Sequence, residues 1–285
     1  MLSWIQKEFK RKAKSHWKGL RISLLRSSRG FCKADLVLAL HRVGVAPGDT
    51  LLVHSSLDKF SAFLGTPTEI ILALQEAVGS TGMLLMPTLP FTGTAVEYVQ
   101  RGTVFDVKKS PSQMGLLTEL FRRSPGVVRS VHPTHAVAAW GRFAAGMVKD
   151  HAFSGTPCGR QTPYGRLLDF EGKILFLGTG IGVMTFFHAV EEILESQFPF
   201  SPFTKEVYSP KSRDEQGNLV DSEMRLFEPK YSRRRNLEKL VPVLKERGWW
   251  NETRIGGIQV ILLKASQVLE ATSILASQRV YCYDE

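Results

Sequence analysis

The spacing of apolar residues along the chain switches repeatedly between a strand pattern and a helix pattern. Short apolar runs that stop at turn residues predict buried strands at 50–53, 83–86, 136–140, 174–177 and 257–263. Apolar residues three to four positions apart predict helices at 33–43, 67–78, 110–123, 143–151, 229–247 and 265–276. Strands that alternate with helices indicate an α/β fold, here a mixed central sheet flanked by helices.

Residue types at the ends of these segments predict where some helices begin and where the chain turns. Thr66 is a suitable N-cap for the helix at 67–78, and Pro67 fits its first turn. Thr185 is predicted to cap a later helix that carries His188. Turns or loops are expected at 46–49, 91–105, 156–164 and 209–220.

The pattern divides the chain into three expected parts. Residues 1–33 form a basic amphipathic helical arm, residues 34–198 form the core, and residues 199–285 form a smaller C-terminal lobe that helps to close the site. The second boundary rests on a change of character near residue 199, where a polar, turn-like segment replaces the regular alternation.

The N-terminal arm holds most of the excess positive charge. Ten of the 37 Lys and Arg residues lie within residues 1–33, against Glu8 as the one acidic residue there, so the rest of the chain is nearly neutral. On a helix the apolar residues of the arm would form one stripe, made of Ile5, Phe9, Ala13, Trp17, Leu20 and Leu24. Such a helix suits an anionic membrane surface, which we expect residues 1–30 to contact. A solvated basic helix docked on the body is the alternative.

Composition narrows the class of protein further. No apolar run approaches the roughly eighteen residues that a transmembrane helix needs. Three cysteines in scattered contexts indicate reduced thiols and a cytoplasmic protein, with peripheral contact at the inner face of the membrane: Cys32, Cys158 and Cys282. Nucleic acid is not an expected partner, because beyond the arm the basic residues do not interleave with aromatic ones.

Residues 173–192 are the most informative segment of the chain. An apolar strand is followed by three glycines, Gly178, Gly180 and Gly182, which allow the backbone to approach a ligand closely. On the next helix His188 and Glu191 are three residues apart and therefore share a face. A carboxylate beside an imidazole fixes its tautomer and orientation, as a general base requires.

Small hydroxyls and backbone amides recur at the predicted strand-to-helix turns. They lie at 54–56, 86–88, 110–115 and 177–180, and free amides at such turns bind anions and the amide-rich arms of cofactors. None of these segments contains a phosphate-binding loop or a dinucleotide fingerprint, which disfavours nucleotide hydrolysis and hydride transfer.

Taken together, these motifs resemble those of the aminoglycoside 3-N-acetyltransferase family. The resemblance spans about residues 35–195 and rests on the order and approximate spacing of its motifs. They are 53–57 (VHSSL), 86–88 (MPT), 105–106 (FD) with 111–115 (PSQMG), 129–135 (RSVHPTH) with 138–141 (AAWG), 156–159 (TPCG), 162–164 (TPY), and 177–180 (LGTG) with 188–191 (HAVE). The resemblance implies a mixed α/β fold, distinct from the common GNAT fold, that transfers acetyl from acetyl-CoA to a small-molecule amine.

The resemblance also implies roles for individual residues. His188 matches the family's proposed general base, Glu191 the carboxylate that orients it, and Thr179 the turn near the thioester. The segments that line the family's CoA cleft contain Ser55, Ser56, Thr88, Ser112, Met114 and Gly115, and His135 lies in a motif close to the cofactor. Residues 34–198 would then be the acetyl-CoA-binding catalytic core.

The same residues allow three other interpretations, which the sequence favours less. A metal site is not expected, because neither 132–135 nor 188–191 has the spacing of a zinc helix such as H-E-x-x-H. Cys158 could accept an acyl group with His135 or His188 as base, although a loop thiol without catalytic duty is commoner. A membrane-bound scaffold that keeps the fold and binds CoA without catalysis is the rival from another class.

The acceptor is the least determined part of the interpretation. Enzymes that modify polycationic aminoglycosides generally offer acidic clefts, and Glu191, Glu192 and Glu195 are acidic. The basic run 230–235 (KYSRRR) has the opposite sign, which favours an amino sugar that carries phosphate, such as a nucleotide- or lipid-linked sugar at the membrane. The sequence also leaves open whether the chain forms a homodimer.

Overall fold

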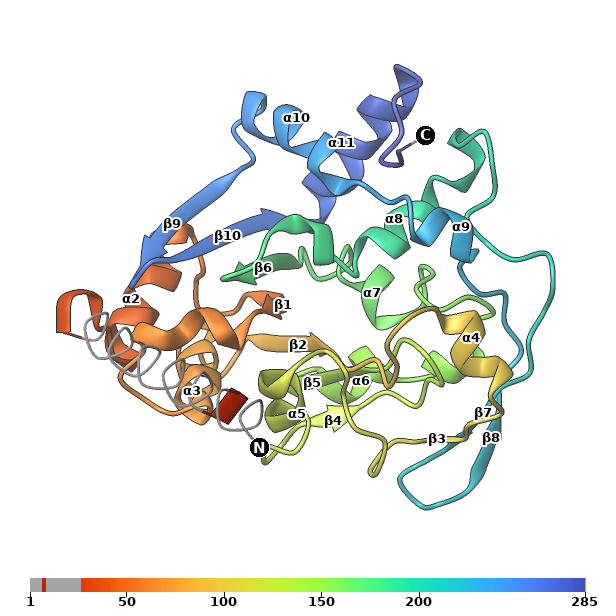
Figure 1. The fold of residues 1–285 in the computed structure, drawn as a ribbon, viewed down its shortest axis with the longest axis horizontal. Helices are drawn as coiled ribbons and strands as arrows, with labels where there is room; N and C mark the ends of the chain where they lie inside the picture. The colour runs from red at the N-terminus through yellow and green to blue at the C-terminus, as the bar shows by residue number, and fades with distance from the viewer. Residues whose placement is uncertain (1–6, 9–26, 285) are drawn as a thin grey trace.

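The structure is a computed structural model that describes residues 7–8 and 27–284. The amphipathic helix predicted within residues 1–33 falls mostly outside these ranges. The described chain forms two sheets surrounded by helices (Figure 1).

A seven-stranded mixed sheet forms the centre of the fold. In chain order its strands are β1 (Thr50–Ser55), β2 (Met83–Pro87), β4 (Val128–Arg129), β5 (Val137–Gly141), β6 (Lys173–Leu177), β9 (Asn251–Ile255) and β10 (Ile258–Lys264). Their order across the sheet is β4-β5-β2-β1-β6-β10-β9. The inner strands β2, β1 and β6 are parallel, and each strand outside them runs antiparallel to its inner neighbour. The predicted mixed α/β architecture is therefore confirmed.

Helices cover both faces of this sheet. The longer ones are α2 (Lys33–Val43), α3 (Pro67–Val78) and α11 (Ala265–Ser277), and the shorter ones are α4 (Ala95–Gln100), α5 (Leu116–Phe121), α6 (Ala144–Val148), α7 (Pro163–Arg166), α8 (Phe187–Ile193), α9 (Pro229–Ser232) and α10 (Val241–Glu246). Short 3-10 helices lie between them: η1 (Leu57–Ala62), η2 (His151–Phe153), η3 (Ile181–Val183), η4 (Glu195–Gln197) and η5 (Leu237–Leu240).

Alternation along the inner strands builds two cores. Successive residues of a strand point to opposite faces, so Leu51 and Val53 pack with α2, α3 and α5, whereas Leu52 packs with α8 and α11 on the other face. Both faces of the inner strands are buried, which explains why the sequences of β1, β2 and β6 are nearly continuous apolar runs.

Parallel pairing brings the functional segments to one edge of the sheet. β1, β2 and β6 all end at the same edge, and the Ser56 amide donates to the Leu177 carbonyl at 3.0 Å. The turns that follow these strands begin at Ser56, Thr88 and Gly178. In open α/β sheets this edge is where ligands bind.

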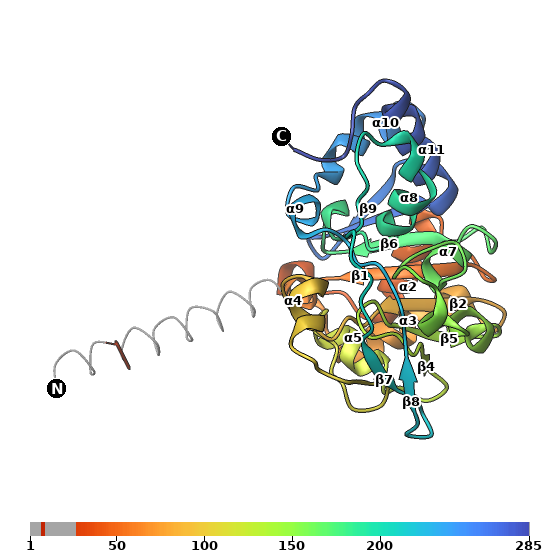
Figure 2. The same ribbon diagram turned by 90° about the vertical axis from the view of Figure 1, so that its right-hand side faces the viewer.

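The second sheet has three strands, β3 (Phe105–Asp106), β7 (Lys211–Arg213) and β8 (Leu219–Asp221), in the order β3-β7-β8. Figure 2 shows it at the end of the molecule opposite α10 and α11. Residues after 199, which we expected to form a smaller lobe, thus supply two strands to this sheet and two, β9 and β10, to the central sheet.

Several predicted elements differ from the structure. Thr185 does not cap α8, whose N-cap is Phe186 without a side-chain hydrogen bond. The loop expected at 91–105 contains α4, and the loop expected at 209–220 contains β7 and the start of β8. The single helix expected at 229–247 is broken into α9, η5 and α10, because Asn236 caps η5 and Pro242 occupies the first turn of α10.

Candidate active site

His188 and Glu191 form a hydrogen-bonded pair on α8. His188 Nδ1 lies 2.8 Å from Glu191 Oε2. The His188 side chain is 16% exposed and that of Glu191 is fully buried. The neighbouring residues Phe187, Ala189 and Val190 are buried in the core and fix the rotation of the helix. The spacing predicted from the sequence therefore brings this pair together.

Two residues from the C-terminal part of the chain complete the surroundings of Glu191. Arg235 donates from Nε to Oε1 at 2.9 Å and from its terminal nitrogen to Oε2 at 3.0 Å. The Tyr283 hydroxyl donates to Oε1. The carboxylate thus accepts hydrogen bonds from three side chains.

These contacts fix the charge states of the pair. Burial raises the pKa of Glu191, but the Arg235 guanidinium and the hydrogen bonds from His188 and Tyr283 outweigh it and bring the pKa to about 2. Burial and the nearby Arg235 lower the pKa of His188 below its ordinary value of 6.5, although Glu191 opposes the change. At neutral pH the pair is a carboxylate and a neutral imidazole.

Aromatic rings enclose the imidazole of His188. Phe227 packs against it with ring centroids 4.1 Å apart, and His135 meets it edge-on with centroids 5.4 Å apart. Burial and the neighbouring His188 hold the pKa of His135 well below its ordinary value, so this ring is neutral too. His135 was expected near the cofactor, and the structure brings its ring into contact with that of His188.

Ser55, Ser56 and Thr179 lie together at the edge where β1 and β6 end. Thr179 is half-buried and lines a cavity of about 300 Å³ with Lys59, Arg254 and Gln259. Among the described residues no hydrogen bond joins Thr179 to His188 or Glu191.

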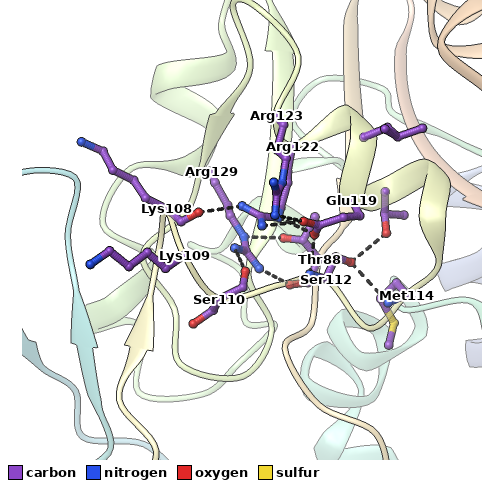
Figure 3. A network of polar contacts seen from close by, with 12 residues as sticks. Thr88, Lys108, Lys109, Ser110, Ser112, Met114, Glu119, Arg122, Arg123 and Arg129 are labelled. Carbon is purple, nitrogen blue, oxygen red and sulfur yellow. Dashed lines mark hydrogen bonds and ion pairs between the residues drawn. The ribbon is translucent and has the colours of Figure 1, made fainter.

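Ser112 and Met114 lie on the segment that leads into α5 (Figure 3), and Gly115 is the N-cap of that helix. The Ser112 hydroxyl is 2.7 Å from that of Thr118 and accepts from the Met114 amide at 3.2 Å. Gly115 has a φ of 107°, and a Cβ built on it would meet no atom within 4 Å, so the backbone there is open to a ligand. Met114 packs against a small cluster that contains Phe91, whose ring contacts His135.

Thr88 supports this segment from inside. Its side chain is fully buried and its hydroxyl donates to the Ala136 carbonyl and accepts from Arg129 Nε at 2.9 Å. Arg129 also donates to the carbonyls of Thr88 and Ser110, both at 2.6 Å (Figure 3). Thr88 therefore contributes by holding Arg129 and not by an exposed hydroxyl.

The other chemistries considered for these residues find little support. Within residues 7–8 and 27–284, no group of three or more His, Cys, Asp or Glu side chains is placed to hold a metal ion. Burial, together with Glu192 and Glu191, raises the pKa of the Cys158 thiol well above its ordinary value, which keeps it protonated and a poor nucleophile.

Comparison with known proteins decides the family. The family model described as "Aminoglycoside 3-N-acetyltransferase" matches residues 52–275, more than three quarters of the chain. The chain belongs to this family. A curated relative, aminoglycoside N(3)-acetyltransferase VII of Streptomyces paromomycinus, is 29% identical over 189 residues, which cover 61% of this chain and 65% of that protein. Aminoglycoside N(3)-acetyltransferase IV of a Salmonella species is 35% identical over 161 residues, covering 56% and 58%. The chain thus matches somewhat less than two thirds of the length of these relatives.

Solved structures of the aminoglycoside 3-N-acetyltransferase family match over most of the chain. A variant of AAC(3)-IVa in complex with a gentamicin has a TM-score of 0.74 at 25% identity, covering 90% of this chain and 92% of that one. AAC-VIa bound to sisomicin has a TM-score of 0.72 at 26% identity, covering 88% and 99%. The binary complex of AAC-IIIb with CoASH, at 21% identity and a TM-score of 0.74, shares the fold.

Two residues that bind Glu191 lie outside the sequence motifs of the site. Arg235 belongs to a basic run whose charge favours a phosphate, and Tyr283 is in no motif. In the structure Arg233 pairs with Glu97 at 3.1 Å, Arg234 donates to the Asp284 carbonyl at 2.7 Å, and Arg235 binds Glu191. The three arginines of the run therefore have protein partners, which weakens the case for a phosphate site there.

Proposed function

We propose that the protein transfers the acetyl group of acetyl-CoA directly to an amine of an amino sugar or aminoglycoside-like acceptor. The hydrogen bond between His188 and Glu191, 2.8 Å long, in a chain of this family carries the proposal. A neutral imidazole whose Nδ1–H donates to a carboxylate keeps the lone pair of Nε2 free to take a proton.

His188 would act as the general base. An alkyl ammonium with a pKa near that of lysine, about 10.4, must lose a proton before its nitrogen can attack. The ammonium gives this first proton to solvent, and the resulting amine attacks the thioester carbon. As the nitrogen–carbon bond forms and the carbon–sulfur bond breaks, Nε2 takes a second proton from the nitrogen and passes it to the departing thiolate. No acyl-enzyme is required, because the thiolate is a good leaving group and one cleft can hold both substrates.

The edge of the sheet would hold acetyl-CoA and stabilise the developing negative charge. Open space beside Gly115 and the cavity lined by Thr179 support a cleft that runs past Ser55, Ser56, Ser112 and Met114. Thr179, or an amide of its glycine turn, would donate to the oxyanion, an interaction worth about 3–4 kcal/mol.

Carboxylates near the dyad support a cationic acceptor. Glu192 follows Glu191 directly and accepts from the Thr156 hydroxyl at 2.5 Å, and Glu195 is one turn further along. Negative charge near the base would attract the amino groups of an aminoglycoside-like molecule. A nucleotide- or lipid-linked amino sugar is the alternative acceptor, supported by the basic arm.

The proposal predicts a strong dependence on His188. The variant His188→Ala should lower kcat by roughly 10²–10⁴ while leaving the affinity for acetyl-CoA within a few-fold of the wild type. Thiol release from acetyl-CoA would be measured with kanamycin-type aminoglycosides and with phosphorylated amino sugars, and calorimetry would give the affinity. His41→Ala, on the exposed side of α2, is the control.

Near-normal kcat in His188→Ala would remove this residue from the mechanism. Wild-type protein that binds CoA but acetylates no amine in the panel would favour the non-catalytic scaffold. Turnover of phosphorylated amino sugars alone would favour the nucleotide- or lipid-linked acceptor.

A peripheral contact with an anionic membrane is a second proposal, through residues 1–30. Its structural support is a cavity of about 570 Å³ between α2 and the β9–β10 turn, lined by Arg29, Arg42 and Arg254. No ion pair within 4.0 Å joins these three guanidinium groups to a carboxylate of the described residues, although Asp35 also lines the cavity and Arg254 helps to lower the pKa of Glu252. Leu38, at the same cavity, is 61% exposed, so basic and apolar side chains meet as they do in membrane-surface sites.

Vesicle binding tests this contact. The full chain should co-sediment with vesicles that contain phosphatidylglycerol and not with pure phosphatidylcholine. Removal of residues 1–26, or the pair Arg42→Gln and Arg254→Gln, should weaken binding several-fold, since each basic residue near an anionic surface contributes about 1 kcal/mol. Lys264→Gln, outside this cavity, is the control. Equal binding by all these variants would rule the contact out.

None of the helices in residues 7–8 and 27–284 combines the length and the apolar character that crossing a bilayer requires.

A further inference from the structure

The sequence motifs do not explain why Arg235 and Tyr283 lie beside Glu191. Both lie in the C-terminal part, 44 and 92 residues from Glu191, and both bind its carboxylate. We infer that they are positioning residues of the proposed dyad, which hold both Glu191 oxygens and thereby fix the tautomer and the direction of His188. This inference rests on the proposed role of His188 as the base.

The hydrogen bonds to Glu191 leave the carboxylate one orientation. Oε1 accepts from Arg235 Nε at 2.9 Å and from Tyr283, while Oε2 accepts from the terminal nitrogen of Arg235 at 3.0 Å and from His188 at 2.8 Å. A carboxylate offers about four lone-pair directions, and here four donor groups use them. Oε2 is therefore aimed at His188 by groups other than His188 itself.

Arg235 also balances the buried charge. The side chain of Glu191 is fully buried and that of Arg235 is 14% exposed, so the two form a buried ion pair. A buried carboxylate without this partner would hold a proton, or would hold its neighbouring imidazole in the charged form. A base must be neutral before it reacts, so the guanidinium preserves the reactive state of His188.

A β-bridge holds Arg235 and Tyr283 next to each other. Arg235 and Tyr283 form an antiparallel bridge, which is flanked by hydrogen bonds from the Asp284 amide to the Arg234 carbonyl at 2.8 Å and from the Asn236 amide to the Cys282 carbonyl at 2.9 Å. The Tyr283 ring packs edge-on against Phe200 with centroids 5.0 Å apart. The bridge places both donors at the dyad and restricts their motion.

Other titratable groups around the dyad do not share this arrangement. The groups that face His188 or Glu191 from neighbouring segments are His135, Cys158, Arg235, Cys282 and Tyr283. Burial keeps His135 neutral and raises the pKa of both cysteines, Cys282 to about 12, so these three carry no charge at neutral pH. Arg235 is the group among them whose removal changes the charge.

The variant Arg235→Met should move the acid limb of the activity profile to higher pH. Arg235 lowers the pKa of His188, so its loss raises that pKa and the base becomes neutral only at higher pH. We expect kcat to fall by about 10²-fold, within the range for disabling a general base, with little change in KM for acetyl-CoA. Arg235→Lys should keep the limb close to its wild-type position but recover only part of kcat, because a single ammonium cannot bind both oxygens in parallel.

The variant Tyr283→Phe removes the hydrogen bond from the Tyr283 hydroxyl to Glu191 and leaves the charge of Arg235 in place. This variant should lower kcat by about tenfold, on the scale of 1.4 kcal/mol, without moving the acid limb as far as Arg235→Met does. Matched controls are Arg233→Gln, an exposed arginine of the same run, and Tyr281→Phe, both of which should behave as the wild type.

Two measurements separate positioning from general support of the fold. The pH dependence of kcat/KM would be compared with NMR titration of the His188 imidazole in each variant, and thermal unfolding would report stability. A double-mutant cycle with Glu191→Gln should be strongly non-additive, because Arg235 acts through Glu191.

An unshifted His188 titration in Arg235→Met, or effects of Arg235→Met and Glu191→Gln that simply add, would overturn the inference. If Arg235→Met does not fold, Arg235→Lys and Tyr283→Phe carry the test. Should the wild type acetylate no amine, the proposed function fails, but the NMR titration still decides whether Arg235 controls the protonation of His188.

Discussion

Two buried arginines of this chain have opposite electrostatic surroundings. Burial and the neighbouring Arg122 lower the pKa of Arg129 to about 9, because its partners are backbone carbonyls and a hydroxyl. For Arg235, burial acts in the same direction, but the Glu191 carboxylate outweighs it and raises the pKa. Arg129 thus serves as a hydrogen-bond donor to a loop, whereas Arg235 serves as the counter-charge of a carboxylate.

Loss of Arg129 should cost stability and, if the proposed cleft holds acetyl-CoA, weaken its binding. Arg129→Met leaves the carbonyls of Thr88 and Ser110 without these donors, so we expect the free energy of unfolding to fall by about 2–4 kcal/mol. KM for acetyl-CoA should rise, since the segment 107–115 loses its anchor. Denaturant unfolding and steady-state kinetics measure the two effects.

A neighbouring arginine provides the comparison. Arg123 is 64% exposed and forms an ion pair with Glu119 at 2.6 Å, and Arg123→Gln should cost less than about 1 kcal/mol. Equal losses for Arg129→Met and Arg123→Gln would contradict the structural role of Arg129.

At the scale of elements, local end signals account for the bounds of two predicted helices, whereas α11 was predicted from its apolar spacing without a side-chain cap. The bounds of α2 and α3 agree with the prediction, because each helix is followed by a glycine with positive φ and α3 has the capping box of Thr66 and Glu69. Thr94 and Glu97 form the same capping box at α4, so the sequence does carry a start signal for this helix within the expected loop. β7, β8 and β9 are short and largely exposed, so they lack the apolar runs that predict strands, although β7 pairs with β8 and β9 with β10 as local hairpins.

The cap of α3 can be tested directly. Thr66→Ala removes the hydroxyl that accepts from the Glu69 amide, and we expect it to lower the free energy of unfolding by about 1 kcal/mol. Thr68→Ala, an exposed position inside the same helix, should be neutral or slightly stabilising because alanine is the better helix former. Chemical denaturation would measure the free energy of unfolding of both variants. Equal losses would exclude capping as the cause.

At the scale of the whole molecule, the site combines segments that the sequence alone could not bring together. His188 and Glu191 are close in the sequence, and helical spacing was enough to pair them. Tyr283 reaches Glu191 because β9 and β10 join the central sheet and α11 returns the chain toward α8, and a bridge joins Arg235 to Tyr283 there. Such contacts join residues that are far apart in the sequence, so local sequence patterns do not predict them.

The bridge between Arg235 and Tyr283 has a consequence for biosynthesis. A ribosome that has just added residue 200 has already made His188, Glu191 and the turns that follow β1, β2 and β6, yet two of the three side chains that donate to the Glu191 carboxylate do not exist. The pair acquires its full set of hydrogen bonds only after residue 283 has left the exit tunnel. A nascent chain can therefore assemble most of the central sheet before its chemistry is complete.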